Sequence, residues 1–216
     1  MKPNDAFSYR YANNKDIAAL SKLHIKTFAN SLGTSIGTRY AREFFKWFID
    51  NDSTIAIACC KSERIIGYAI GAPDGYSGEL TKSTLPHILL GIASHPKSLL
   101  HPNFSIEMTV RFKNLLRGIF TTKNSRSPIN IQTDKTPFVL VGIGIDPEFR
   151  RRHIGITLLE NFENEVWRKL FTKIRLTVHE SNIKAISFYE KADWQFDYKN
   201  RSKMRYVKIK SDMFNG

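Results

Sequence analysis

A chain of 216 residues, with 42% apolar and 25% charged residues, has the size and balance of a globular protein, and we expect residues 1–216 to form one domain. No apolar run approaches the roughly 18 residues needed to cross a bilayer, and the amino terminus, MKPNDAFSYR, lacks the apolar core of a secretory signal. We therefore expect no membrane segment and a cytoplasmic location, while the net charge of +13 favours anionic partners such as nucleotides, coenzymes, nucleic acid or acidic lipid.

The first 72 residues predict a strand, two helices and a hairpin. Residues 9–12, YRYA, alternate as a short strand does, and a helix follows for which Asn14 or Asp16 can serve as cap. A second amphipathic helix is predicted over about 38–50, and the apolar runs at 54–60 and 64–72 are joined by the short polar turn KSE. The first helix has one apolar face, made of Ile17, Leu20, Leu23, His24 and Phe28.

Residues 73–136 form a predicted insertion that is partly helical. The stretches DGYSG and TTKNSRSPINIQTDKTP are typical of loops, whereas Leu85–Leu100 and Phe104–Phe120 are mostly helical in pattern. Because Pro86, Pro96 and Pro102 punctuate the segment, we expect its helices to be short or offset.

The pattern sharpens after residue 137. FVLVGIGI at 138–145 is a near-continuous apolar strand of the kind that is buried on both faces. A strand at 174–178, a helix at 182–191 and two strands at 194–198 and 202–210 follow, so the sequence predicts an α/β (α+β) fold with a central mixed sheet of about seven strands flanked by helices. The helix between the first two of these strands is predicted on Leu158, Leu159, Phe162, Val166 and Leu170.

The loop after residue 145 crowds cations at the start of a helix, where Arg150, Arg151 and Arg152 stand together. Unpaired backbone N–H groups converge at a helix start and the helix dipole adds positive potential, so this turn is a candidate phosphate site. Gly155 fits that interpretation, because a residue without Cβ lets a pyrophosphate approach the main chain. The spacing alone fits a solvated basic turn equally well.

Cysteine and histidine predict neither a disulfide framework nor a metal site. Cys59 and Cys60 are adjacent within the apolar run TIAIACC and are interpreted as buried thiols. The six histidines are scattered, and none joins a cysteine or carboxylate at ligand spacing. We therefore predict that the protein holds no metal.

Two segments together bring a family into view. PEFRRRHIGITLLENF, at 147–162, resembles the acyl-CoA-binding signature of the GNAT N-acyltransferase superfamily, which runs Arg or Gln, two residues, Gly, one residue, Gly or Ala. NIKAISFYEKADW, at 182–194, is similar to the second signature of that superfamily, Asn-x-x-Ala followed by Tyr-Glu-Lys. The detailed match covers about residues 138–198, while the first 72 residues agree only in the order of elements, and the insertion at 73–136 has no counterpart.

The resemblance implies a GNAT-like fold, acetyl-CoA as the acyl donor, and roles for particular residues. Tyr189 matches the tyrosine that serves many members as a general acid toward the departing CoA thiolate, and Asn182 matches the asparagine that helps to hold the cofactor side of the cleft. From the residues alone, Tyr189 fits an aromatic core position and Asn182 a helix cap, and Asn182 can be both. The implied contacts to the pantetheine arm and the pyrophosphate come from Ile143, Gly144, Ile145, Arg150, Arg151, Arg152, His153, Ile154, Gly155 and Ile156.

Two residues depart from the pattern. His153 stands where the first glycine is usual, and we expect a negative φ to suffice there because the residue is at a helix start. Asp193 stands where a glycine commonly ends the last helix, and Asp tolerates the left-handed conformation that such a cap requires. Both departures bear on cofactor affinity rather than on the fold.

The chemistry that the resemblance implies is direct transfer of an acetyl group to a primary amine. A backbone N–H near residues 143–145 could polarise the thioester carbonyl. Glu79, Asp146, His179 and Glu180 lie near predicted strand ends and are candidates for the base that takes a proton from the amine, but each also fits a polar loop residue and none is assigned. No metal enters this reaction.

The acceptor is expected to be a small molecule with a primary amine. TFANSLGTSIGTRYAREFFKWF, at 27–48, loosely resembles the second-helix region of GNAT-like proteins that acetylate nucleotide-linked amino sugars, and a chain of +13 suits an anionic acceptor. Amino termini of peptides or ribosomal proteins and antibiotics stay open, polyamines are disfavoured by repulsion, and a homodimer is left open.

The competing functions are a basic nucleic-acid-binding module and a GNAT-like domain that binds acyl-CoA without turnover. Lys199, Arg201, Lys203 and Arg205 alternate along the predicted final strand and would place four cations on one face, with tyrosines nearby. A solvated edge strand guarded by charge explains the same pattern more economically, so nucleic acid is a less favoured partner.

Overall fold

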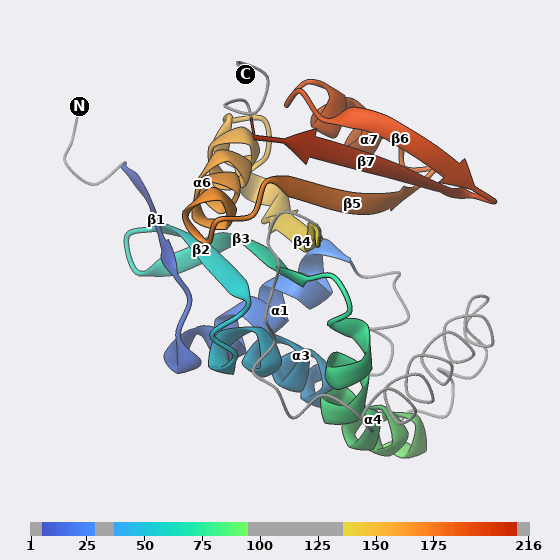
Figure 1. Cartoon of the computed structure of the whole chain (residues 1–216). Coiled ribbons are helices and arrows are strands. Elements are labelled where there is room, and N and C mark those ends of the chain that lie inside the picture. The colour runs from blue at the N-terminus through green and yellow to red at the C-terminus, as the bar shows by residue number, and fades with distance from the viewer. Residues whose placement is uncertain (1–5, 29–36, 95–135, 211–216) are drawn as a thin grey trace.

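The computed structural model describes residues 6–28, 37–94 and 136–210, which build a mixed sheet of seven strands (Figure 1). The strand order is β1-β2-β3-β4-β5-β7-β6; β4 and β5 pair in parallel and every other pair is antiparallel. This is the predicted mixed sheet of an α/β fold. The strands are β1 (Phe7–Tyr11), β2 (Ile55–Lys61), β3 (Arg64–Pro73), β4 (Phe138–Ile145), β5 (Lys173–His179), β6 (Gln195–Asn200) and β7 (Lys203–Ile209).

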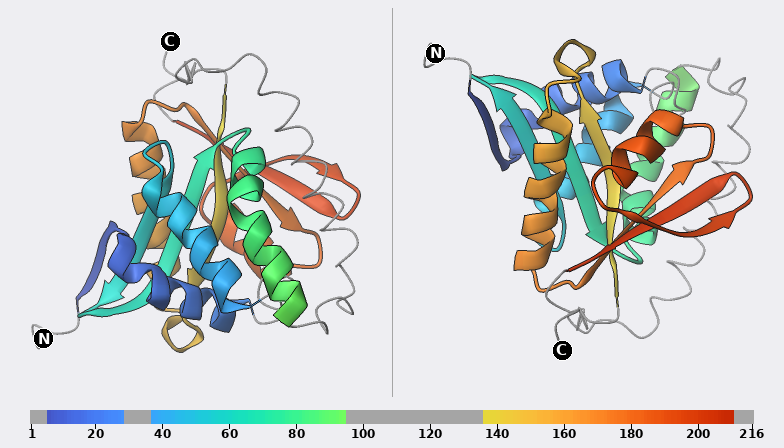
Figure 2. Two further views of the ribbon diagram at one scale, coloured as in Figure 1. Left: turned by 90° about the horizontal axis from the view of Figure 1, so that it is seen from below. Right: turned by 90° about the horizontal axis from the view of Figure 1, so that it is seen from above.

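Helices cover both faces of the sheet (Figure 2). On one face lie α1 (Ile17–Thr27), α3 (Thr38–Asp50) and α4 (Ser77–Ser94), and on the other lies α6 (Ile154–Arg168) across β1–β4. The short α7 (Ile183–Glu190) lies on the side of α6, beside β5 and β7. No helix in the described ranges has the length and apolar character that a membrane span requires.

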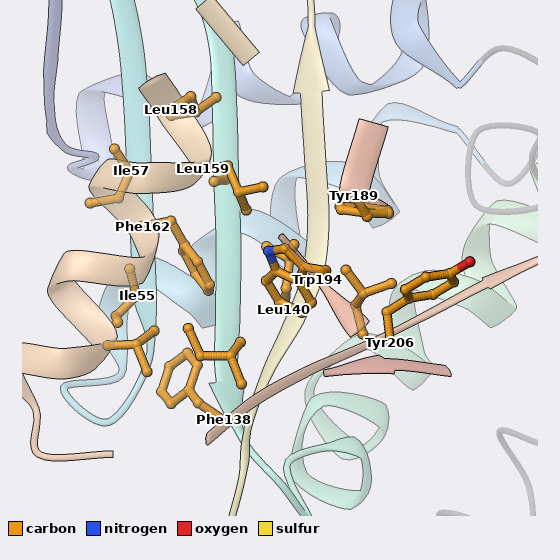
Figure 3. Packing of buried hydrophobic residues seen from close by; sticks show 14 of the residues in the cluster. Ile55, Ile57, Phe138, Leu140, Leu158, Leu159, Phe162, Tyr189, Trp194 and Tyr206 are labelled. Atoms are coloured by element: carbon orange, nitrogen blue, oxygen red, sulfur yellow. The ribbon is translucent and has the colours of Figure 1, made fainter. Parts of the chain in front are cut away.

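Each face of the sheet has its own apolar core. Under α6, large buried side chains such as Phe138, Phe162 and Trp194 pack together, and this core continues to Tyr189 and Tyr206 (Figure 3). The core on the other face is built by Leu20, Phe45, Phe48, Tyr68 and Ile70. The alternation of side chains along β2 and β3 feeds both cores, which is why these strands are apolar at nearly every position.

The sheet splits between β4 and β5. β3 pairs with β4 along its length, whereas β5 pairs with β4 only at Phe138 and Val139 (Figure 1). A β-bulge lies at the divergence: Ile70 pairs with Gly142 and Gly71 with Leu140, so Val141 is the extra residue. Bulges bend the strand that carries them, and β4 diverges from β5 from this point on. Residues 141–143 and Ile145 are half-buried, so the predicted burial on both faces is wrong for this half of the strand.

The segment between β3 and β4 differs from its prediction. A helix was expected from about Leu85, but α4 begins at Ser77, and Pro86 lies inside it. The first turns escape recognition because their buried positions include Thr81 and Thr84, whose hydroxyls donate to the carbonyls four residues earlier at 2.7 Å. The expectations for Phe104–Phe120 and for residues 95–100 fall outside the described residues.

Two helix ends also differ in detail. Asn13 caps the short turn before α1, because it accepts from the Lys15 amide. Asp16 occupies the N-cap position of α1 as predicted, but its carboxylate accepts from the Asn13 amide and not from the helix. The capping box places Asp16 within reach of Arg10, which forms an ion pair with it at 2.6 Å. The second difference is at the carboxyl end of α6. The helix ends at Arg168, so Leu170, which was predicted on it, lies beyond its end, 73% exposed and with a positive φ.

Candidate active site

The split gives β4 an edge with unpaired backbone groups. The Asp146 amide donates to the Ile66 carbonyl at 2.8 Å, so the backbone groups of residue 146, and by alternation those of Gly144 and Gly142, are directed to β3. Those of Ile143 and Ile145 are directed to the other edge, where β5 has moved away. This edge can form backbone hydrogen bonds with an extended ligand that carries amides.

The turn after β4 ends in a row of free amide donors. The amides of Glu148, Phe149 and Arg150 are used within the turn, where they bond to Asp146 and Pro147. By contrast, no amide of residues 151–156 has an acceptor in the described part of the chain, and no side chain caps α6. Free donors and the dipole of a 15-residue helix coincide at 151–156, so these residues fit the predicted phosphate site better than the rest of the turn.

Two residues of this row have left-handed backbone conformations. Arg151 has φ of 63° and His153 has φ of 59°. The expectation that a negative φ suffices at His153 is therefore wrong, and the reason a glycine is usual there is now visible. A histidine tolerates this region at a cost of about 1 kcal/mol. Asp193, with φ of 61°, has the left-handed conformation that was predicted for it.

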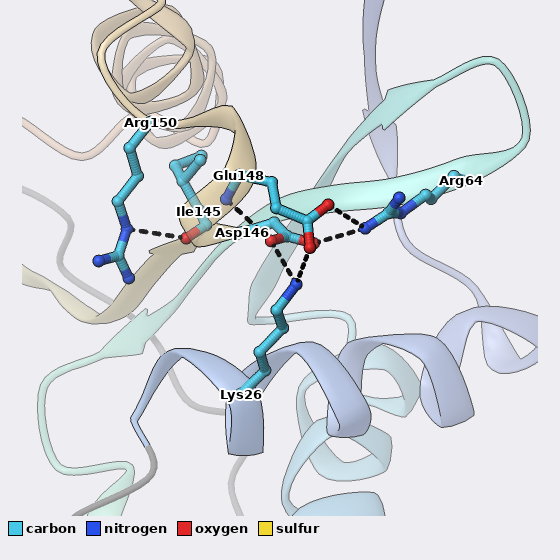
Figure 4. A network of polar contacts seen from close by, with 6 residues as sticks. All are labelled: Lys26, Arg64, Ile145, Asp146, Glu148 and Arg150. Carbon is cyan, nitrogen blue, oxygen red and sulfur yellow. Dashed lines mark hydrogen bonds and ion pairs between the residues drawn. The ribbon is translucent and has the colours of Figure 1, made fainter.

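The arginines of the turn are exposed and have no carboxylate partner among the described residues. Arg150 Nε donates to the Ile145 carbonyl at 3.3 Å, so this side chain folds back along the end of β4 (Figure 4). Arg152 stacks on the Phe149 ring, with its guanidinium carbon 5.5 Å from the ring centre. Their charge is therefore available to an anion that binds the amides.

The two nearby carboxylates are bound to other cations. Lys26 Nζ contacts Asp146 at 2.8 Å and Glu148 at 2.7 Å, and Arg64 contacts the same two carboxylates at 2.8 and 3.3 Å (Figure 4). Burial alone would raise the pKa of Asp146, but the hydrogen bonds from Lys26, the Glu148 amide and Arg64 outweigh it and lower that pKa. The network ties α1 and β3 to the turn and keeps both carboxylates away from the arginines.

Gly155 and Asn182 both help to place α7 next to the turn. A Cβ on Gly155 would lie 3.2 Å from the Phe188 ring, so the missing side chain lets α7 approach the start of α6. Asn182 caps α7, because its side-chain oxygen accepts from the Ala185 amide at 3.2 Å. The helix-cap interpretation of Asn182 is confirmed.

Tyr189 is buried on α7 between Phe188 and Trp194, with ring centres 5.3 and 5.9 Å away. Burial raises the pKa of its phenol, so the hydroxyl stays protonated and can donate a hydrogen bond. No partner for this hydroxyl is found within residues 6–28, 37–94 and 136–210. Tyr189 thus occupies an aromatic core position, as its residue type allowed, and its hydroxyl is a hydrogen-bond donor that the core does not use.

The candidate bases are mostly engaged elsewhere. Asp146 is bound by two cations, Glu180 pairs with Lys199, and the His179 ring bonds to Ser181 at 2.8 Å. Glu79 lines an open cavity of about 740 Å³ between α3 and α4 that shares no residue with the β4 edge. None of the four reaches into the split as a free base.

The cationic face proposed for nucleic acid is not formed. Lys199 lies on β6 opposite Met204, Arg201 is in the turn, and only Lys203 and Arg205 lie on β7. Because side chains alternate along a strand, Lys199 shares a face with Met204 and not with Lys203 and Arg205. The prediction of four cations on one face is therefore wrong, since a hairpin turn interrupts the row.

One pair of polar residues at the split was missed from the sequence. His24 Nδ1 on α1 lies 2.6 Å from the Tyr68 hydroxyl on β3, and the Tyr68 ring lies beside Gly142 and Gly144 of β4. The sequence places His24 only on the apolar face of its helix. The available signal was the spacing of two glycines, two residues apart in an apolar strand, which leaves room on one face for a large neighbour.

The open edge of β4 lies next to free amides and to arginines without carboxylate partners among the described residues, an arrangement that suits an extended ligand with phosphates. Residues 127–194 match the family model described as "Acetyltransferase (GNAT) family". This match covers less than half of the chain, and it agrees with the fold and with the two sequence motifs that resemble the GNAT superfamily. No curated protein matched the chain in a comparison of sequences.

Solved structures with the same fold are distant in sequence. The PaiA N-acetyltransferase from Thermoplasma acidophilum, in complex with coenzyme A, is 14% identical with a TM-score of 0.57 over 95% of this chain and 99% of that one. The ribosomal-protein-S18-alanine N-acetyltransferase from Escherichia coli is 11% identical with a TM-score of 0.54 over 94% and 91%. The ribosomal-protein-alanine N-acetyltransferase from Brucella melitensis is 11% identical with a TM-score of 0.56 over 94% and 99%.

Proposed function

We propose that the protein transfers an acetyl group from acetyl-CoA to a primary amine of a small, anionic acceptor, for which a nucleotide-linked amino sugar is the leading candidate. The observation that carries this proposal is the row of free amides at residues 151–156 beside the unpaired edge of β4. The first feature suits a diphosphate and the second suits the amides of a pantetheine arm, and coenzyme A contains both.

The donor would lie along β4 and end at the turn. Backbone groups of Ile143 and Ile145 would bond to the pantetheine amides, and the amides of 151–156 would bond to the diphosphate. Arg150 and its neighbours would supply counter-charges, each charge-assisted hydrogen bond contributing about 1.5–3 kcal/mol. The coenzyme A in the T. acidophilum structure, which shares the fold, supports this choice of donor.

The reaction would be a direct displacement. The neutral amine attacks the thioester carbonyl, the C–N bond forms, and the C–S bond breaks to release the thiol. Tyr189 would donate its hydrogen bond to the departing sulfur. Its raised pKa makes complete proton transfer unfavourable until charge develops on sulfur, so the contribution is greatest in the transition state.

The nature of the acceptor is supported by charge. An excess of 13 positive charges attracts an anionic acceptor and repels a polycation. The acidic cavity between α3 and α4, lined by Glu43, Asp50, Asp52 and Glu79, is a local exception that shares no residue with the proposed donor site. Small anionic amines are therefore expected to react faster than polyamines.

A non-catalytic domain that binds acyl-CoA is the alternative with the same fold, and a nucleic-acid module is the alternative of another class. The second is disfavoured, because the cations expected on one face are divided between β6, a turn and β7. Heating in the presence of ligands separates the classes. A CoA-binding protein gains several degrees of thermal stability from acetyl-CoA at both low and moderate salt, whereas a nucleic-acid binder responds to nucleic acid and only at low salt.

Turnover is tested by release of free thiol from acetyl-CoA in the presence of single amines. The panel contains nucleotide-linked amino sugars, the same sugars without the nucleotide, peptide amino termini, aminoglycosides and a polyamine. We expect release with a nucleotide-linked amine and little with the polyamine. Thermal protection by acetyl-CoA without release for any amine would instead identify a non-catalytic binder.

A further inference from the structure

His24 and Tyr68 form a short hydrogen bond inside an aromatic environment. His24 Nδ1 on α1 lies 2.6 Å from the Tyr68 hydroxyl on β3, so a proton can move directly between the two side chains. The rings of Phe28, Phe44 and Phe45 have centres 5.1, 5.8 and 5.7 Å from the His24 ring. Burial lowers the pKa of His24 to about 4, so the ring is neutral at physiological pH.

This pair adjoins the split of the sheet. Tyr68 pairs with Gly144 across β3 and β4, and its hydroxyl is 3.2 Å from the point where a Cβ on Gly144 would lie. The ring is therefore drawn over β4 on the face of α1, opposite to the face that carries α6 and α7. Burial raises the pKa of Tyr68, and the Tyr189 phenol adds to this shift.

The proposed reaction needs a proton acceptor at this place. β4, FVLVGIGI, carries no ionisable side chain, and the four candidates named from the sequence are engaged in other contacts or line another cavity. With its proton on Nε2, the neutral His24 ring accepts a hydrogen bond from Tyr68 at Nδ1, and the Tyr68 oxygen keeps lone pairs that can accept from a substrate. Hydroxyl and imidazole then form a two-step path for a proton.

We propose that the Tyr68 hydroxyl accepts the proton that the acceptor amine releases and passes its own proton to His24 Nδ1; this inference rests on the proposed acetyltransferase function. As the C–N bond forms, the amine proton moves to the Tyr68 oxygen and the Tyr68 proton moves to His24. As the C–S bond breaks, the hydrogen bond from Tyr189 stabilises the departing thiolate. One imidazolium and one thiolate are thereby formed, and charge is conserved.

The resting state is restored through water. The imidazolium at His24 is a strong acid in its apolar surroundings, and its partly exposed ring returns the proton to solvent. The thiolate takes a proton from solvent, while Tyr189 stays protonated because burial raises its pKa. Amide and thiol are the only net products, so the path needs no further reactant.

Two variants test the path, and each keeps the local packing. Tyr68→Phe removes the hydroxyl and keeps the ring. His24→Asn keeps a hydrogen-bond acceptor near the position of Nδ1 but cannot take up a proton. Tyr11→Phe is the control. Tyr11 lies on the edge strand β1, and the substitution likewise removes one hydrogen bond of a tyrosine hydroxyl, the bond to Glu165 at 2.8 Å.

The assay measures thiol release with saturating acetyl-CoA, using hydroxylamine as a small nucleophile and the fastest amine of the panel. We expect Tyr68→Phe to lower kcat about 100-fold or more and His24→Asn about tenfold or more, since a general base contributes about 10²–10⁴-fold. The KM for acetyl-CoA and its thermal protection should change less than threefold in both variants, and Tyr11→Phe should match the wild type.

The outcomes separate the path from the function on which it rests. If the wild type is active and Tyr68→Phe keeps more than a third of its kcat, the path is wrong and the acetyltransferase assignment stands. If His24→Asn keeps the kcat of the wild type, the pair acts only through its hydrogen bond, and proton transfer to His24 is refuted. If the wild type binds acetyl-CoA but acetylates neither hydroxylamine nor any amine, the proposed function fails and the path fails with it.

Discussion

Two glycines of β4, two residues apart on one face, should respond in opposite ways to the same added methyl group. A Cβ on Gly144 would lie 2.9 Å from Cε1 and 3.1 Å from Cζ of Tyr68, whereas a Cβ on Gly142 would have its nearest neighbours at 3.7–3.9 Å. Neither glycine has a positive φ, so an alanine can adopt either backbone conformation. Gly144→Ala and Gly142→Ala are thus a matched pair: the first crowds Tyr68, and the second makes ordinary contacts with Ile70 and Tyr68.

The magnitudes follow from those distances. Gly142→Ala makes ordinary van der Waals contacts and reduces the freedom of the unfolded chain, so we expect it to stabilise the protein by about 0.5 kcal/mol. Gly144→Ala must displace a ring that is 1% exposed and packed against Phe45 at 5.0 Å, and overpacking of this kind costs about 1–3 kcal/mol. Displacement of Tyr68 also weakens its bond to His24, which adds about 1 kcal/mol.

Denaturant unfolding of both variants measures the difference, which should amount to about 2–4 kcal/mol in favour of Gly142→Ala. The same experiment on a Tyr68→Ala background provides the control, because removal of the ring should abolish the penalty at residue 144 and leave residue 142 unaffected. Equal stability of the two variants would falsify the placement of the Tyr68 ring over β4. It would also remove the geometric basis for a proton path through that hydroxyl.

Three further outcomes are expected. Arg150→Ala should weaken acetyl-CoA binding about tenfold in calorimetry, and by less as salt is added. Unchanged affinity would mean that Arg150 is a solvated surface charge that does not contact the coenzyme. Tyr189→Phe should lower kcat far more than it weakens acetyl-CoA binding, and an equal loss of both would indicate packing alone. His24 has a folded pKa of about 4 against an ordinary 6.5, so the native state binds fewer protons than the unfolded state in that window and stability falls as the pH is lowered through it. The loss approaches about 3 kcal/mol at pH 4, and His24→Asn should reduce the drop in Tm between pH 7 and 4.5; the same drop in both proteins would contradict a buried neutral ring.

The order of elements could be predicted because each strand and helix of the described regions, apart from the start of α4, has the period of its structure in its own residues. The run FVLVGIGI, the helix on Leu158 and Phe162, and the cap at Asn182 are local features. The start of α4 was missed because threonines occupy buried positions and satisfy their hydroxyls within the helix. A helix whose buried face is partly polar has no apolar period to detect.

The candidate site was only partly predictable, since its local and non-local parts differ. The arginine turn and Tyr189 lie in contiguous motifs, which is why the sequence alone could propose them as site residues. The split of the sheet depends on a bulge in one strand and on the departure of another, and Tyr68 and His24 meet across 44 residues of sequence. The left-handed conformation of His153 was mispredicted because the constraint comes from the turn before α6 and not from the residue itself.

The charges around the turn show why three neighbouring arginines can remain available to a ligand. Two carboxylates stand within a few residues of them, and in an unstructured loop these would neutralise part of the positive charge. In the folded protein, Lys26 from α1 and Arg64 from β3 bind both carboxylates and hold them on the other side of the turn (Figure 4). Lys26→Met should therefore release Glu148 toward the arginines and weaken anion binding at 151–156, although Lys26 itself contacts no part of that row.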